Sequence, residues 1–309
     1  MRHLLCTALA LVPAAATHAA DTIDPLTRPI VSDAAAKWNR PQTPLRIHGD
    51  TYYVGVAGLS SVLIHGDKGS ILLDGDLPQS APEIEAHIRQ LGFKVEDIKL
   101  ILNSHAHFDH AGGIAALQRD SGAEVVASPS GAEALRSGRV LADDPQAGFS
   151  DNSFPAVARV RTVRDGETVR VGDLAVTAHF TPGHTSGSTT WTWRSCENEK
   201  CLDVVYADSL NAISAPGFNF LADATHADLT VRLRKSIQTV ANLPCDILIS
   251  VHPEVSGADE KLKKLETKPA TNPFVDPQAC RAYARSYDKA LDARIEQEKA
   301  AQRKGAGAT

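Results

Sequence analysis

The sequence has no excess of basic residues. Its 309 residues include 32 Lys and Arg against 37 Asp and Glu, which gives a formal net charge of -5. A protein that binds nucleic acid usually carries a basic excess, so we expect no nucleic-acid partner. No apolar run reaches the roughly 18 residues that a transmembrane helix needs, so we expect no membrane span. Apolar residues still make up 43% of the chain, which excludes disorder over most of its length.

The N-terminus has the three parts of a secretory signal peptide. A short start containing Arg2 precedes a mostly apolar stretch over residues 4–16, and the small residues Thr17 and Ala19 follow. We therefore expect residues 1–19 to be a signal peptide that is cleaved near Ala19, which predicts a periplasmic or secreted protein. Residues 20–309 would form a single domain with an N-terminal arm and a C-terminal helix, because no linker divides them.

Cysteine is scarce: the chain has five, and Cys6 would leave with the signal peptide. The remaining four are an even number, as disulfides in an exported protein require. They allow three pairings. The short spacing of Cys196 and Cys201 suits a bridge across a hairpin, which would leave Cys245 to pair with Cys280. The alternative is four free thiols, which an oxidising compartment disfavours.

Strand and helix patterns along the chain predict an α/β fold. Residues 21–50 contain four prolines and are expected to form an extended arm. Strands are expected at 52–56, 61–65, 70–74, 99–103, 124–127, 168–171, 174–181, 189–194, 203–207 and 246–250. Helices are expected at 80–91, 113–121, from 225 through 240, at 257–266 and at 278–299, with a loop at 136–156. Helices at several points along two groups of strands predict sheets covered on their outer faces.

Histidine and aspartate gather directly after a buried strand. His105, His107, Asp109 and His110 fall within six residues after the strand at 99–103. His184 follows the strand at 174–181, and His252 follows the strand at 246–250. Side chains at the ends of such strands are expected to meet at one sheet edge, and His with Asp suits zinc or a similar ion. Six ligands divide as three and three, which fits two metals that each keep an open position and share a hydroxide.

Several longer motifs accompany these ligands. They are Leu59-Ser60-Ser61, Ile71-Leu72-Leu73-Asp74-Gly75, Leu77-Pro78-Gln79-Ser80-Ala81-Pro82, Leu100-Ile101-Leu102-Asn103-Ser104, Ala111-Gly112-Gly113, Thr181-Pro182-Gly183-His184-Thr185 and Tyr206-Ala207-Asp208-Ser209-Leu210. With His-x-His-x-Asp-His, this set resembles the metallo-β-lactamase superfamily, and within it the secreted subclass B3 enzymes. The resemblance runs from about Trp38 to Cys280.

The resemblance implies an αβ/βα four-layer sandwich, in which two mixed β-sheets are flanked by helices and the metals lie at one rim. It implies two Zn²⁺ ions, the first held by His105, His107 and His184, and the second by Asp109, His110 and His252. We expect Asp109 and His184 to be catalytic. The family also often pairs cysteines like Cys245 and Cys280.

The resemblance further implies a zinc-dependent β-lactamase. A hydroxide shared by the metals would attack the lactam carbonyl, and the C–N bond would then break without a protein nucleophile. The partner is a small-molecule substrate, a β-lactam, and we expect a monomer. Ser209 and Asn211 lie two residues apart after the strand at 203–207, so both are expected to face the substrate carboxylate. Alternatively, Asn211 caps a turn.

Some residues depart from the family pattern or have two interpretations. The family commonly has Gly where this chain has Asp76, and Ser where it has Asn211. Asp74 ends a buried strand and either orients a liganding His or caps a turn. Trp38 either flanks the site or packs the arm. Four further histidines are expected to be solvated: His48, His65, His87 and His226.

Two other functions compete with β-lactam hydrolysis. Another hydrolase of the superfamily, a glyoxalase-II-like thioesterase, a lactonase or a phosphodiesterase, would commonly use a metal-bridging Asp, and Asp208 in Ala-Asp-Ser is the candidate. The signal peptide, the cysteines and the segment 77–82 favour the β-lactamase. A periplasmic zinc-binding protein without activity would have closed coordination or a His-rich tract, and the sequence has neither.

Overall fold

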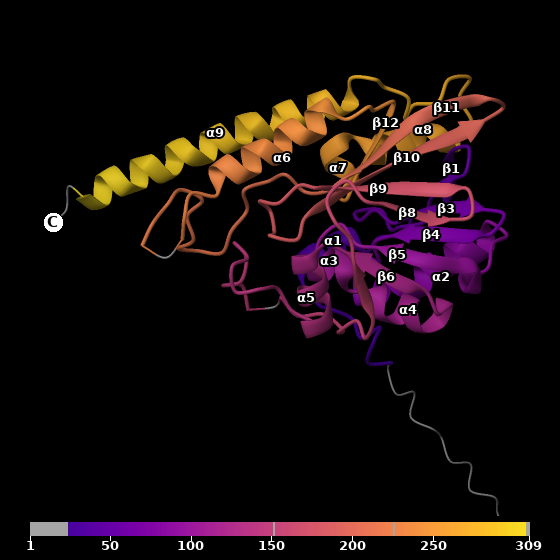
Figure 1. Cartoon of the computed structure of the whole chain (residues 1–309), viewed down its shortest axis with the longest axis horizontal. Coiled ribbons are helices and arrows are strands. Elements are labelled where there is room, and N and C mark those ends of the chain that lie inside the picture. The colour runs from indigo at the N-terminus through magenta and orange to yellow at the C-terminus, as the bar shows by residue number, and fades with distance from the viewer. Residues whose placement is uncertain (1–23, 151, 225, 307–309) are drawn as a thin grey trace, which may run out of the picture.

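Two mixed β-sheets pack face to face, and helices cover both outer faces (Figure 1). This arrangement comes from a computed structural model that describes residues 24–150, 152–224 and 226–306. The predicted signal peptide, residues 1–19, lies outside the described residues. No helix in the described ranges has the length and apolar character needed to cross a bilayer.

The first sheet has seven strands in the order of the sequence. They are β1 (Leu45–His48), β2 (Thr51–Tyr53), β3 (Val62–Gly66), β4 (Gly69–Leu73), β5 (Ile98–Leu102), β6 (Glu124–Ala127) and β7 (Val160–Thr162). β1 to β4 pair antiparallel, and β4 to β7 pair parallel. The second sheet has the order β12-β11-β10-β9-β8. Its strands are β8 (Thr168–Val171), β9 (Leu174–Phe180), β10 (Thr189–Glu197), β11 (Lys200–Ala207) and β12 (Ile247–Ser250), and only β11 and β12 pair parallel.

The helices form the outer layers. α2 (Ala81–Gln90), α4 (Ile114–Ser121) and α5 (Pro129–Ser137) pack on the outer face of the first sheet. α6 (Thr230–Asn242) and α9 (Ala279–Ala306) pack on the outer face of the second (Figure 1). Short helices lie near the strand ends: α1 (Asp33–Trp38), α3 (Phe108–Ala111), α7 (Pro253–Ser256) and α8 (Ala258–Glu266). The four layers confirm the expected αβ/βα sandwich.

Alternating apolar side chains explain why the sheets are covered on both faces. Successive residues of a strand point to opposite faces. Ile71 and Leu73 of β4 therefore join the core between the sheets, whereas Leu72 packs under the helices. On β11, Tyr206 faces the central core and Val205 faces α6 and α9. Strands buried on both faces read as continuous apolar runs, which is the pattern that the sequence has there.

Two predictions about local structure were wrong, and one helix was not predicted. The expected arm at 21–50 contains α1 and β1, because Ser32 caps α1 by accepting a hydrogen bond from the Ala35 N–H, and β1 joins the first sheet. The expected loop at 136–156 is present, but its first two residues belong to α5, which was not predicted. His48 and His87 are buried rather than solvated, and the Nδ1–H of His87 donates to the carbonyl of Val54.

Two disulfides are present. Cys196 and Cys201 face each other across the hairpin of β10 and β11, with 4.0 Å between their Cα atoms. Cys245, next to β12, is bonded to Cys280 on α9, 35 residues further along the chain. The second bond therefore fixes the start of α9 to the second sheet.

We predict that removing the Cys245–Cys280 bond lowers the free energy of unfolding by about 3–4 kcal/mol, because the bond closes a long loop in the unfolded chain. The measurement is urea unfolding of the double variant Cys245→Ser, Cys280→Ser. The control is Cys196→Ser, Cys201→Ser, which opens a short loop and should cost about 2 kcal/mol. Equal stability of the first variant and the native chain would contradict the prediction.

Candidate metal centre

The ends of β5, β9 and β12 bring the candidate ligands together at one edge of the sandwich. After β5, the chain turns so that His107 has an extended backbone and begins α3, which carries Asp109 and His110. His184 follows β9, and His252 follows β12. All of these side chains are buried except that of His252, which is 17% exposed.

The first group is formed by His105, His107 and His184. One ligand atom from each residue lies within 4.8 Å of the other two. The Nδ1–H of His105 donates to Asp208 Oδ1 at 2.6 Å, and its buried Nε2 has no hydrogen-bond partner. The Nε2–H of His107 donates to Asp144 Oδ2 at 3.0 Å. The Nδ1–H of His184 donates to the carbonyl of Asn211. Each of the three rings therefore has one nitrogen fixed by an oxygen, and its other nitrogen is free to bind a metal.

The second group is formed by Asp109, His110 and His252. The Nε2 atoms of the two histidines lie 3.2 Å apart, and each lies 3.4 Å from Asp109 Oδ2. Around a metal bonded at about 2.0–2.1 Å, the edge of a tetrahedron is about 3.4 Å long. The three donor atoms therefore have the spacing of one face of such a tetrahedron, and the residues fit a metal ion.

For His105, His184 and Asp109, the pKa shifts favour the forms that bind metal. Burial holds the pKa values of His105 and His184 well below the ordinary range, so both rings are neutral at pH 7. Burial opposes ionisation of Asp109, but contacts with His110 and His252 hold the pKa of that carboxyl well below its usual range. Neutral imidazole and ionised carboxylate are the ligand forms. The pKa values of His107 and His252 shift the other way: burial acts to lower both, but hydrogen bonds to Asp144 and Asp109, respectively, raise them overall. In these two rings the carboxylate favours the protonated form, and a metal would have to displace that proton.

Two carboxylates hold the ligands: Asp208, which the sequence named only as a candidate metal-bridging residue, and Asp144, which it did not name. Asp208 follows β11 in the same strand-end position as the other site residues, which was an available signal for its role beside His105. Asp144 lies in a loop without such a signal. The amide nitrogen of Gln146, in the same loop, lies 3.4 Å from His184 Nε2.

Asp74 stabilises the turn before His105 by hydrogen bonds. It accepts hydrogen bonds from the backbone N–H and the hydroxyl of Ser104, from the amide of Asn103 and from the hydroxyl of Tyr206. No hydrogen bond joins it to a histidine in the described part of the chain. Burial raises the pKa of Asp74 to about 7, and the hydrogen bonds from Ser104 oppose that rise.

The other predicted site residues lie beside the cluster. Ser209 is 2% exposed, and the carbonyl of Asn211 accepts a hydrogen bond from His184 Nδ1 at 3.3 Å. The side-chain oxygen of Asn211 accepts from the N–H of Ile213, which is a turn interaction. Trp38 packs against the ring of His252, with 5.3 Å between centroids.

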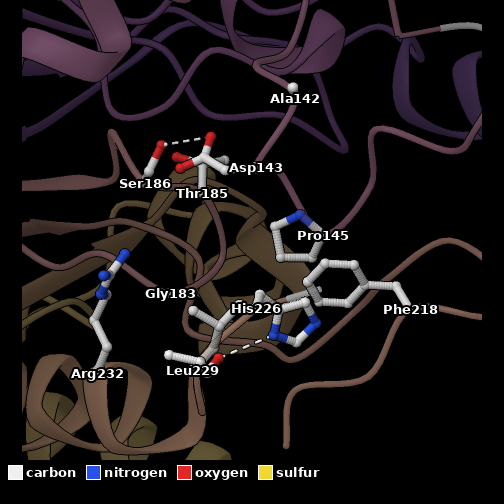
Figure 2. A pocket seen from close by; sticks show the side chains of 11 residues that line it. Ala142, Asp143, Pro145, Gly183, Thr185, Ser186, Phe218, His226, Leu229 and Arg232 are labelled. Carbon is white, nitrogen blue, oxygen red and sulfur yellow. Dashed lines mark hydrogen bonds between the residues drawn. The ribbon is translucent and has the colours of Figure 1, made fainter. Parts of the chain in front are cut away.

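A cavity of about 570 Å³ borders the two loops that position the ligands (Figure 2). Gly183 and Thr185, on either side of His184, line it, as do Asp143 and Pro145, on either side of Asp144. Figure 2 shows Phe218, Leu229 and Arg232 around the same space, with the Ser186 hydroxyl donating to Asp143.

Comparison with known proteins relates this chain to the metallo-beta-lactamases. A family model described as the metallo-beta-lactamase superfamily matches residues 54–196. The solved structure of Rm3 metallo-beta-lactamase is 51% identical, with a TM-score of 0.84, and the match covers 87% of this chain and 100% of that one. The chain belongs to the metallo-beta-lactamase superfamily. MEM-A1, a subclass B3 metallo-beta-lactamase from a soil metagenome library, is also 51% identical, with a TM-score of 0.82 and coverage of 85% and 99%.

Other similar proteins are hydroxyacylglutathione hydrolases. A hydroxyacylglutathione hydrolase of Methylobacterium nodulans is 30% identical over 130 residues, which are 42% of this chain and 41% of that protein. The match thus spans about two fifths of the relative's length. As a metallo-beta-lactamase superfamily protein, this chain is a hydrolase with His-rich groups suited to metal binding.

We predict that Asp208→Asn weakens Zn²⁺ binding by about 10–100-fold, because the carboxylate orients His105 and increases its basicity. Competition with a chromophoric chelator measures the affinity. Asp203→Asn is the matched control, since Asp203 lies on β11, the strand that Asp208 follows, but pairs with Arg194 at the surface. Unchanged affinity in Asp208→Asn would show that the ring does not depend on this carboxylate.

Proposed function

We propose that the protein is a secreted zinc-dependent β-lactamase that hydrolyses the amide bond of β-lactam antibiotics. The observation that carries the proposal is the converging set of five histidines and Asp109 in a chain that spans the full length of a 51% identical metallo-beta-lactamase. His105, His107 and His184 would hold one Zn²⁺, and Asp109, His110 and His252 a second. All six donors come from one chain, which supports action as a monomer.

When bound, the two ions would lower the pKa of a water molecule and polarise the lactam carbonyl. The chain's own residues prepare the site for them. Asp208 and Asp144 fix the ring orientations of His105 and His107, so that neither ring must reorient during turnover. Asp109 is the one carboxylate among the six ligands, and its charge offsets part of the charge of the metals.

The two disulfides support the proposed export. Such bonds persist in the periplasm and outside the cell, whereas reducing systems remove them in the cytoplasm. Cys280, which is bonded to Cys245, is only 1% exposed. It lies in the apolar cluster that joins α9 to the second sheet. A signal peptide over residues 1–19 would bring the chain to that compartment.

Thioester hydrolysis is the second candidate, because the curated relatives are hydroxyacylglutathione hydrolases. In that interpretation Asp208 would bridge the metals. However, Asp208 Oδ1 already accepts the hydrogen bond from His105 Nδ1 at 2.6 Å. The carboxylate thus orients a ligand through Oδ1, and its buried Oδ2 has no hydrogen-bond partner among the residues that the structure describes. The β-lactamase is favoured by the 51% identity to Rm3 metallo-beta-lactamase along the full length of that chain.

A substrate comparison tests the proposal. The Zn²⁺-loaded full chain is assayed with the chromogenic β-lactam nitrocefin and with S-lactoylglutathione, each with and without a chelator. We expect chelator-sensitive hydrolysis of nitrocefin and little hydrolysis of the thioester. Hydrolysis of the thioester alone would establish the second candidate. Zn²⁺ binding without hydrolysis of either substrate would indicate a binding protein.

We also propose that Ser209 and Asn211 bind the substrate carboxylate. A hydroxyl and an amide are neutral donors, and such a contact is equal in the ground and transition states. Replacing both residues by Ala should therefore raise KM more than it lowers kcat for several β-lactams. The control is Asn242→Ala, because the amide of Asn242 bonds only within α6 in the described chain. An unchanged KM would assign Asn211 to the turn with Ile213.

The cavity beside His184 would receive the part of the substrate outside the ring. Pro145, Phe218 and Leu229 offer apolar contacts, and Arg232 adds a positive charge at the same space.

A further inference from the structure

Asp76 is buried in a backbone conformation that suits glycine. Its side chain is fully buried, and its φ is +53°. A left-handed residue with a Cβ is strained relative to Gly, and Gly is the residue that the family resemblance leads one to expect here. The buried carboxylate adds a desolvation cost. The contacts of the Asp76 side chain must offset both of these costs.

The carboxylate holds the loop formed by residues 55–61. Asp76 Oδ2 accepts a hydrogen bond from the Val56 N–H at 3.2 Å, and Oδ1 accepts one from the Ser61 hydroxyl at 2.9 Å. The two bonds fasten both ends of the loop to one side chain. Gly55 permits this approach, because a Cβ at that position would lie 2.4 Å from the Ser61 nitrogen.

The same loop holds His252. The carbonyl of Gly58 accepts a hydrogen bond from His252 Nδ1 at 3.3 Å, which directs Nε2 toward Asp109. The Ser60 N–H donates to the carbonyl of Val251 at 2.9 Å, immediately before the histidine.

The backbone around Asp76 holds the segment that contains His110. The Gly75 N–H donates to the carbonyl of His110 at 2.9 Å, and the carbonyl of Asp76 accepts from Gly113 at 3.2 Å. Asp76 also forms a parallel bridge with Ala111. The segment Gly75–Asp76 is therefore bonded both to the chain around His110 and to the loop that holds His252. The Nε2 atoms of these two histidines lie 3.2 Å apart.

We propose that Asp76 is a positioning residue that sets the spacing of His110 and His252, and thereby the affinity of the second metal position. The inference rests on the proposed pair of metal ions. Asp76 itself touches no metal ligand atom through its carboxylate. Burial raises the pKa of Asp76 to about 7, and the Ser61 bond opposes that rise.

The test measures the affinity of each Zn²⁺ binding step to the metal-free full chain, by calorimetry and by competition with a chelator. In Asp76→Gly the carboxylate is lost but the backbone strain is relieved. We expect the weaker-bound ion to lose about 10–100-fold in affinity, as when other supports of ligands are removed. The affinity of the other binding step should stay within about threefold of its value in the native chain. Ser61→Ala removes one of the two bonds and should have a smaller effect in the same direction.

Controls separate positioning from general destabilisation. Asp173→Gly changes an exposed aspartate and should alter neither step. In an Asp109→Asn background, which lacks the second position, adding Asp76→Gly should leave the remaining step unchanged. Cobalt(II) spectra should change only for the ion bound at the second position.

The outcomes are distinct. If both Zn²⁺ affinities are unchanged in Asp76→Gly, the inference is overturned. An equal loss of affinity in both binding steps would overturn it as well. A native chain that binds a single Zn²⁺ would instead contradict the proposed pair of metal ions, whatever Asp76 does.

Discussion

The centre depends on a repeated hydrogen bond from one ring nitrogen of a histidine to a fixed oxygen. His105 donates to Asp208, His107 to Asp144, His184 to the carbonyl of Asn211, and His252 to the carbonyl of Gly58. Each bond selects the tautomer and aims the other nitrogen into the shared space. Without these bonds, the buried imidazole rings would have several orientations, and their free nitrogens would not converge.

The oxygens come from elements far apart in the sequence, so the centre requires the two sheets to be held in register. The core between the sheets supplies most of that constraint, and a few polar contacts refine it. The indole N–H of Trp191, on β10, donates to the carbonyl of Asn103 beyond β5 at 3.1 Å. Tyr206, on β11, donates to Asp74 beyond β4 at 2.9 Å. Both bonds cross from the second sheet to the first beneath the ligands, where packing alone would tolerate small shifts.

Sequence reasoning succeeds where one periodic pattern determines the structure. Apolar runs such as 99–103 and 246–250 are strands because they are buried on both faces, and the residues that follow them meet at one edge. The same pattern predicts that the six candidate ligands lie together at that edge. Sequence reasoning failed where the determinant is a tertiary partner. β1 is a strand because β2 pairs with it, and the prolines around it concealed that pairing. Asp144 gains its role only because its loop lies against His107.

The departure at Asp76 shows a different limit. The sequence identified the position as unusual, but the reason lies in bonds to Val56 and Ser61 that join it to a loop some twenty residues earlier. No local pattern encodes such a contact. Asn211 is similar, since its backbone carbonyl, rather than the side chain that differs from the family, contacts His184.

The number of Zn²⁺ ions bound per chain tests the central claim most directly, namely that six side chains form two metal positions of three ligands each. Metal analysis of the purified full chain, without dialysis against chelator, should give a value close to two. A single tightly held Zn²⁺ accompanied by full hydrolytic activity would contradict the account, because Asp109, His110 and His252 would then have no metal to hold.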